Sequence, residues 1–186
     1  EQAWAHPTGS HSSEAYALTT DLQGNVYAAG RFSGTYTLGS AIVFNSGTAT
    51  HNYLVKYDTA QQAVWAVSLS GNDNNTIRKL ATDQAGNLYL VGTYVNNLTI
   101  GSTTLSNSTN KQRNFLAKYD ASGNLLWVNE IDGNDENAAS GLVVDSQGDV
   151  YIAGHFYGTA NWSPTQSQTN TGTGSDSYVA KYNGAG

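Results

Sequence analysis

A short segment that is apolar on both faces of a strand occurs three times along the chain. The three copies span residues 21–30, 83–92 and 145–154, and each opens with an Asp-x-x-Gly turn. In such a turn the Asp carboxylate accepts backbone hydrogen bonds and the Gly adopts a positive φ, so each copy predicts a hairpin of antiparallel strands. A strand without alternating polar positions, such as Leu88-Tyr89-Leu90-Val91, is expected to be covered on both faces.

Two further strands recur with the same period. Aromatic and β-branched residues, typical of strands, fill residues 53–58, 115–120 and 178–183. A strand centred on a tryptophan follows at residues 63–67 and 125–129, and residues 1–7 around Trp4 repeat it. The intervening polar insertion is expected to hold a small extra hairpin. No apolar stripe with helical spacing persists over a helix-length window, so we expect no helix.

These elements predict an all-β fold of three four-stranded antiparallel repeats of about 62 residues. The order Asp-x-x-Gly-Asn-hydrophobic-Tyr, Lys-Tyr-Asp and Gly-Asn-x-x-Trp resembles the seven-bladed β-propeller repeat family of secreted and surface bacterial proteins. The resemblance covers nearly all of residues 1–186 and implies one array of propeller blades, at roughly 8–69, 70–131 and 132–186, in an extracellular setting. It implies no catalytic residues. The chain departs from the family in having three units and in Asn183, where the other units have Asp.

Three blades are too few to close a propeller, so two apolar blade faces and one strand edge are expected to stay open. Residues 1–7 form a spare outer strand, and the third unit lacks one. We therefore expect the strand to complete the third blade of another copy, giving a two-fold ring, or a filament where exchange does not close. The assembly strands are represented by Trp4, Ala5, Tyr178, Ala180 and Tyr182. The alternative is a fragment of a longer chain that supplies the remaining blades.

A second candidate surface lies in the insertion of the third unit, which matches the other two poorly. Trp4, Trp65 and Trp127 recur with the repeat and are expected to pack, whereas Trp162 does not recur. An exposed Trp162 beside His155 and Tyr157 could stack on a sugar ring. The alternative function is therefore a carbohydrate-binding, lectin-like module of a larger propeller, with glycans as partners.

Metal chemistry has little support in the sequence. The four histidines lack the spacing of a zinc site, and the oxygen-rich loops at 71–75 and 132–137 lack the regular ligands of a calcium loop. Calcium is the one cofactor that the loops suggest, and a solvated loop is favoured over it. Lys56, Lys118 and Lys181 recur inside apolar strands, and we expect each to pair with a nearby carboxylate or carbonyl.

The amino-acid composition argues against two classes of partner, nucleic acids and a membrane spanned by a helix. Charged residues make up 12% of the chain, the net charge is −6, and the eight Lys and Arg are too scattered for a nucleic-acid surface. Cysteine is absent, and no apolar run approaches the length of a membrane-spanning helix. The bulk of Ser, Thr, Asn and Gly suits long extracellular β loops. No signal peptide is visible and no methionine occurs, so we expect a processed or trimmed chain.

Serine and aspartate are abundant, but no Gly-x-Ser-x-Gly turn or other activating context appears. The sequence therefore favours a non-enzymatic, secreted structural or interaction protein that assembles by strand exchange.

Overall fold

The computed structural model describes residues 12–38, 42–71, 74–133 and 135–186. Within these ranges the chain forms antiparallel β-strands and turns, with no helix. The predicted all-β class is thus confirmed for the part that the structure describes. Trp4 and Ala5 of the predicted exchange strand lie outside the described residues.

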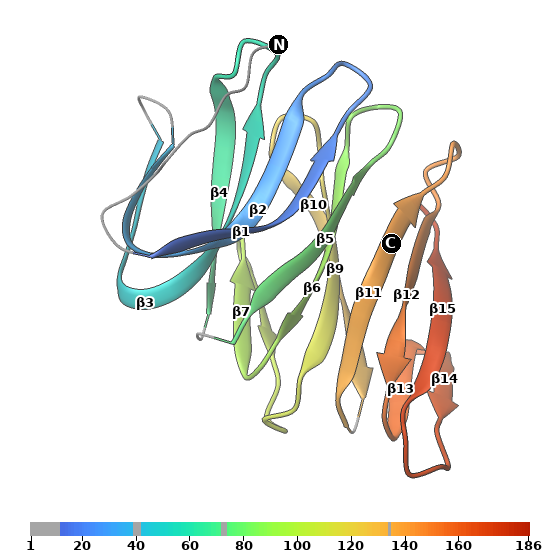
Figure 1. Cartoon of the computed structure of the whole chain (residues 1–186). Helices are drawn as coiled ribbons and strands as arrows, with labels where there is room; N and C mark the ends of the chain where they lie inside the picture. Colours follow the sequence, from blue (N-terminus) through green and yellow to red (C-terminus); the bar gives the residue numbers. More distant parts are fainter. Residues whose placement is uncertain (1–11, 39–41, 72–73, 134) are drawn as a thin grey trace.

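Strands that follow one another in the chain pair into three sheets. The first sheet holds β1 (Ser13–Thr20), β2 (Val26–Leu38), β3 (Ile42–Tyr57) and β4 (Ala63–Gly71). The second holds β5 (Thr76–Thr82), β6 (Leu88–Tyr94), β9 (Arg113–Tyr119) and β10 (Leu125–Gly133). The third holds β11 (Asn137–Val144), β12 (Val150–Phe156) and β15 (Asp176–Tyr182). Figure 1 shows them side by side in chain order.

The Asp-x-x-Gly turns form as the sequence predicts. Asp21 Oδ1 accepts hydrogen bonds from the backbone N–H groups of Gln23 and Asn25, at 3.0 and 2.9 Å. Gly24 takes a φ of +83°, a left-handed conformation that costs glycine little. Asp83 and Asp145 make the same pair of backbone contacts in the other two units. Each turn therefore fixes the first hairpin of its sheet.

A small hairpin from one unit extends the sheet of the unit before it. β7 (Asn97–Ile100) and β8 (Thr103–Ser106) form one hairpin, and β13 (Thr159–Ser163) and β14 (Gln166–Thr169) form another. β7 pairs with the end of β4, and β13 with the end of β10. The predicted insertion hairpin is thus present in the second and third units, where it links consecutive sheets.

In the first unit the strands run on through the insertion instead of breaking. Gly34, with φ +72°, lies at a shift in register between Ser33 and Thr35, and β2 bends there. Tyr53 pairs with Gly30, which lies six residues before Tyr36 in the chain. In an unbent strand Tyr36 would therefore lie far from Tyr53, but the two rings are only 4.7 Å apart. The first sheet is therefore strongly curled, as Figure 1 shows for β3.

Two hydrophobic cores lie between successive sheets, and a third lies inside the curl of the first sheet. All seven residues of β6 are buried, which confirms that this strand is covered on both faces. One core joins the first two sheets, with Leu54 and Phe115 among its members. A second joins the last two sheets, with Leu116 and Ile152. Each inner sheet face thus depends on its neighbour for burial.

Candidate interaction surface

Consecutive sheets are joined by polar contacts that repeat along the chain. Lys56 Nζ and Trp65 Nε1 donate hydrogen bonds to the carbonyl oxygen of Ala121, at 3.2 and 3.1 Å. At the next junction Lys118 and Trp127 donate in the same way to Gly184, at 3.0 and 3.3 Å. The accepting carbonyl belongs to the following unit in both cases.

These lysines also approach a carboxylate of their own unit. Lys56 Nζ lies 3.8 Å from Asp21, and Lys118 Nζ lies 3.9 Å from Asp83. The ammonium groups also lie over the rings of Tyr27 and Tyr89, 5.1 and 4.8 Å from the centroids. The prediction that the repeated lysines pair with a carboxylate or a carbonyl is confirmed at both positions.

The tyrosine of each double-faced strand reaches across the same junction. Tyr27 donates to Asp21 Oδ2 at 3.1 Å, and its hydroxyl lies 3.3 Å from the carbonyl oxygen of Gly86 in the next unit. Tyr89 lies in the same way near Asp83 and Gly148, at 3.3 and 3.4 Å. Burial, followed by the neighbouring carboxylate, raises the pKa of both tyrosines well above the ordinary value. Both hydroxyls therefore act as neutral donors.

The third sheet presents the same face without a neighbour among the described residues. Leu54 and Leu116 are fully buried, whereas Val179 at the corresponding position is 77% exposed. The side chain of Lys181 is 52% exposed and pairs with Asp149 at 2.7 Å, against 11% and 12% for Lys56 and Lys118. We call the face that carries Tyr151, Val179 and Lys181 the trailing face.

The curl of the first sheet covers most of its other face, where Val55 is fully buried in a third core. The expectation of a fully open blade face is therefore wrong at this end, and only its margin is exposed. Leu18 is 69% exposed, whereas the corresponding Leu80 is 8% exposed because it packs against the first sheet. Val26 and Ala28 are partly exposed, although their counterparts in β6 are fully buried. We call the face that carries Leu18, Val26 and Ala28 the leading face.

The predicted assembly residues of β15 point away from the trailing face. Tyr178, Ala180 and Tyr182 pack against the core between the second and third sheets. The Tyr182 hydroxyl donates to the carbonyl oxygen of Trp162 at 2.9 Å. β15 pairs with β12 along one edge, and its other edge has no partner strand among the described residues. Strict alternation along β15 would have identified Val179 and Lys181 as the exposed side chains.

The predicted sugar-stacking surface does not form as expected. Trp162 is partly buried, with its ring 4.3 Å from Tyr178 and 5.7 Å from Phe156. The expectation of an exposed Trp162 is wrong, because β13 turns this side chain into the second core. His155 and Tyr157 are exposed and lie edge to face at 6.1 Å, away from that core.

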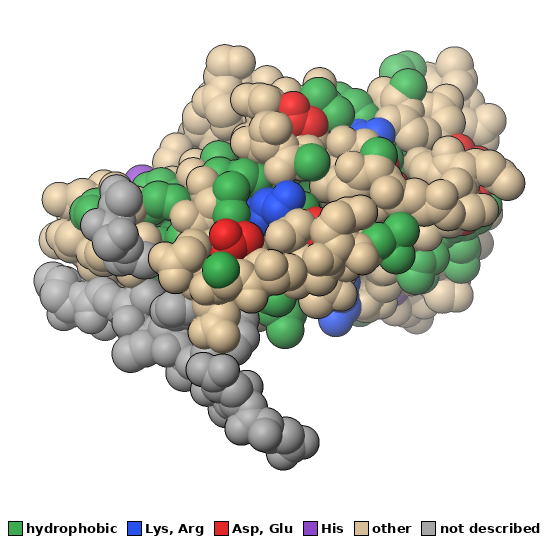
Figure 2. Space-filling view, turned by 90° about the horizontal axis from the view of Figure 1, so that it is seen from above, with side chains coloured by type: hydrophobic (Ala, Val, Ile, Leu, Met, Phe, Trp, Pro, Cys, Tyr) green, Lys and Arg blue, Asp and Glu red, His purple; other side chains and the backbone are tan. Residues whose placement is uncertain are grey.

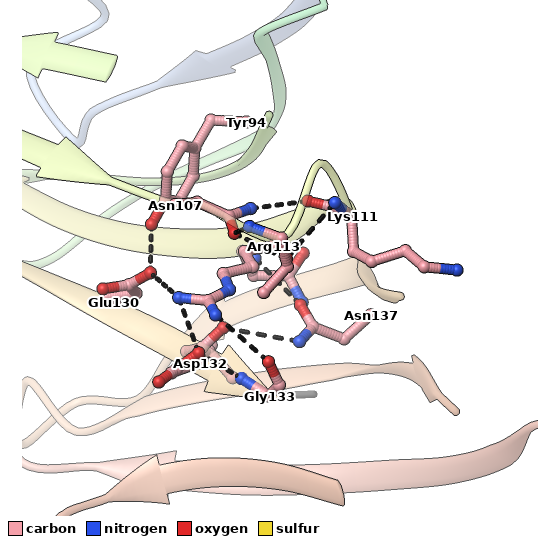
Figure 3. A network of polar contacts seen from close by, with 11 residues as sticks. Tyr94, Asn107, Lys111, Arg113, Glu130, Asp132, Gly133 and Asn137 are labelled. Atoms are coloured by element: carbon pink, nitrogen blue, oxygen red, sulfur yellow. Dashed lines mark hydrogen bonds and ion pairs between the residues drawn. The ribbon is translucent and has the colours of Figure 1, made fainter. Parts of the chain in front are cut away.

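A charged network fixes the far end of the second sheet (Figure 3). Arg113 lies 2.9 Å from Glu130 and 2.6 Å from Asp132, and it donates to the carbonyl oxygen of Gly133. Tyr94 donates to Glu130. Burial opposes the charge of Arg113, but the hydrogen bond to Glu130 and the charge of Asp132 outweigh it and raise the pKa. Arg113 therefore stays charged and ties β9 to β10.

Two carboxylates of the oxygen-rich loop at 132–137 form ion pairs in and beside this network. Asp132 pairs with Arg113, and Asp135 pairs with Lys111 at 3.2 Å. The described residues contain no group of three or more metal-binding side chains. They also contain no helix of the length and apolar character needed to cross a membrane. Calcium binding stays a prediction.

No family model matches the chain. An alignment of 132 positions, which covers 69% of the chain, is 28% identical to the regulatory protein FlaEY of Caulobacter vibrioides. The match spans 14% of the length of that protein. The chain is thus similar to a small part of a much longer bacterial protein.

Proposed function

We propose that the chain is a run of three β-propeller-type blades and serves as a non-enzymatic, extracellular structural or interaction protein that associates by strand exchange at the free edge of β15 and through the trailing face. The exposure of Val179, at a position where Leu54 and Leu116 are fully buried, carries this proposal. The extracellular setting is supported by the polar, uncharged composition. The face in Figure 2 is mostly tan, with few charged side chains.

The partner that we propose is a second copy of the chain. An uncovered β edge offers a row of backbone groups to another strand, and each hydrogen bond formed there contributes about 1 kcal/mol. In the second sheet, β9 pairs Lys118 with Trp127 and Ala117 with Val128. A strand donated in the same register by another copy would set Trp4 against Lys181 and Ala5 against Ala180. Burial of Val179 would add apolar area to the interface.

The rival explanation is that further units of a longer chain cover both faces. The similarity to a small part of FlaEY is compatible with this alternative. The two explanations differ in the behaviour of the 186-residue chain by itself, because only the first predicts that it associates.

Sedimentation or light scattering of the purified chain at micromolar concentration tests the proposal. We expect a dimer or larger assembly of the 19.7 kDa chain. Val179→Asp would place a charge in the interface and is expected to give a monomer. Leu126→Asp is the matched control. Leu126 and the corresponding Val64 are about equally exposed, at 52% and 53%, so a neighbouring unit does not cover this position.

A wild-type chain that stays monomeric contradicts association between copies. An assembly that is insensitive to Val179→Asp would show that the trailing face is not the contact. Electron microscopy of the wild type separates closed rings from filaments.

A further inference from the structure

The inner strand of every unit is interrupted at the same repeat position. The register of β1 shifts between Ala15 and Ala17, that of β5 between Ile77 and Lys79, and that of β11 between Ala139 and Gly141. Each shift is a β-bulge that leaves one residue without a partner on the adjacent strand. The bulged residues are Tyr16, Arg78 and Ser140. The backbone feature repeats, but the side chain that it presents differs in size and charge.

The bulge in β5 changes which side chains face outward. In a regular strand consecutive side chains alternate between faces. Here Ile77 is buried, Arg78 and Lys79 are both exposed, and Leu80 is buried again. The bulge therefore lets two consecutive cationic side chains reach the same side of the molecule.

The three bulged residues meet in one groove. β1, β5 and β11 follow one another across the molecule in Figure 1. A groove of about 480 Å³ between them is lined by Tyr16, Arg78, Lys79 and Ser140, above the apolar Ile77 and Ala139. This volume lies within the usual range of small-ligand sites. Its walls offer an aromatic ring, two cations and a hydroxyl.

The cations of this groove differ from the others in the chain. Six of the eight Lys and Arg have a carboxylate within ion-pair distance, namely Arg31, Lys56, Lys111, Arg113, Lys118 and Lys181. For Arg78 and Lys79 no carboxylate of the described residues lies that close, and Arg78 Nε donates only a long 3.4 Å hydrogen bond to Thr93.

The Glu14 carboxylate, which contacts the groove residue Tyr16, already has a cationic partner outside the groove. Glu14 pairs with Arg31 at 3.2 Å and accepts a hydrogen bond from the Tyr16 hydroxyl. The Arg31 guanidinium lies 5.6 Å from the centroid of the Tyr16 ring. The groove thus keeps two positive charges without a counter-charge, in a chain whose net charge is −6.

We propose that this groove binds a small anionic ring compound, such as a sugar that carries a carboxylate or a phosphate. The fork of Arg78 suits two oxygens of either group, and Lys79 supplies a second charge. Ser140, whose hydroxyl has one weak 3.5 Å contact to the carbonyl of Ala153, can bond a ring hydroxyl. Tyr16 supplies an apolar wall. The site does not depend on association between copies, because its residues lie outside the leading and trailing faces.

Titration of the 186-residue chain with glucuronate, glucose 6-phosphate and glucose, followed by NMR shifts of backbone amides, tests the proposal. At least one anion is expected to bind and to shift amides of β1, β5 and β11, with glucose much weaker. Arg78→Gln and Lys79→Gln are each expected to weaken binding by about tenfold, because a hydrogen bond to a charged group is worth about 1.5 kcal/mol or more. Lys111→Gln, an exposed cation outside the groove, is the control.

Preference for glucuronate or for glucose 6-phosphate identifies the anionic group. The proposal is overturned if neither anion binds at millimolar concentration or if glucose binds equally well. Unchanged affinity in Arg78→Gln and Lys79→Gln would also overturn it. Both residues are exposed, so the variants are expected to fold, and their amide spectra check this.

Discussion

Lys118 Nζ donates a 3.0 Å hydrogen bond to the carbonyl oxygen of Gly184, which lies 66 residues further along the chain. The same ammonium group lies 3.9 Å from Asp83, and the Lys118 side chain is 12% exposed. A cation so placed joins the second sheet to the turn that follows the third. Lys181 holds the corresponding position in the third unit, where its side chain is half exposed and its carboxylate partner is Asp149.

This difference predicts unequal effects of the same substitution. Lys118→Met is expected to lower the free energy of unfolding by about 1–3 kcal/mol, because it removes the charged donor from the partly buried Gly184 carbonyl, which keeps only its 3.3 Å contact to Trp127. Lys181→Met is expected to change it by less than about 1 kcal/mol, as for an exposed ion pair. Urea unfolding of both variants at one low protein concentration measures this. Equal losses would contradict a special role for the Lys118 junction.

The apolar residues at corresponding positions of the second and third units, Leu116 and Val179, predict a similar contrast in stability. Leu116→Ala opens a cavity in the core between the second and third sheets and is expected to cost about 2–5 kcal/mol. Val179→Ala removes a side chain that is 77% exposed and is expected to change stability by less than about 0.5 kcal/mol. Urea unfolding at submicromolar concentration, where association is weakest, gives both values. A large loss in Val179→Ala there would mean that the trailing face is covered within a single copy.

The carboxylate of Asp21 predicts a loss of stability in acid. Burial opposes its charge, but hydrogen bonds from Asn25 and Tyr27 and the charge of Lys56 outweigh this and lower its pKa. Because the folded pKa lies below the unfolded value of about 4, Asp21 stabilises the fold above that pH. This contribution is lost as the pH falls through the folded pKa.

Asp21→Asn should therefore reduce the free energy of unfolding at neutral pH and flatten its decline between neutral and acidic pH. Asp120 and Asp145 also have lowered pKa values, so part of the decline is expected to remain. Denaturant unfolding across this pH range measures both slopes. Identical pH profiles for the variant and the wild type would show that Asp21 does not contribute to the acid sensitivity.

Local chemistry made much of this fold predictable. In each turn the Asp side chain accepts hydrogen bonds from backbone N–H groups two and four residues later, and a Gly takes a positive φ. These two features specify a turn within five residues. The apolar strands that follow it predict their own burial. The partners of Lys56 and Lys118 could be foreseen only as a class, since the accepting carbonyls lie more than 60 residues away.

Features that depend on contacts between distant segments were not predictable. The pairing of β7 with β4 involves two residues from each strand, and nothing in either segment specifies the other. The burial of Trp162 depends on Tyr178, across a polar loop. The groove between Tyr16, Arg78 and Ser140 requires the register of three strands, because a bulge leaves no mark in the hydrophobic pattern.

The turn at Gly123 predicts how tightly consecutive units pack. Gly123 has φ +86°, and an added Cβ would come within 2.7 Å of the Trp65 ring. Gly47, at φ +61°, would place a Cβ with no atom within 4 Å. Gly47→Ala therefore measures the cost of the left-handed backbone alone, about 1–2 kcal/mol. Gly123→Ala should cost that amount plus about 1–3 kcal/mol for displacing the indole.

The indole N–H of Trp65, which donates to Ala121, reports this displacement directly. Its NMR signal, assigned by its loss in Trp65→Phe, should shift strongly in Gly123→Ala and stay in place in Gly47→Ala. An unshifted signal together with equal stabilities in the two variants would mean that the turn has room for a methyl group. The Trp65 contact would then tolerate changes in the following unit, and the repeated tryptophan would contribute burial of its ring without specifying the spacing between units.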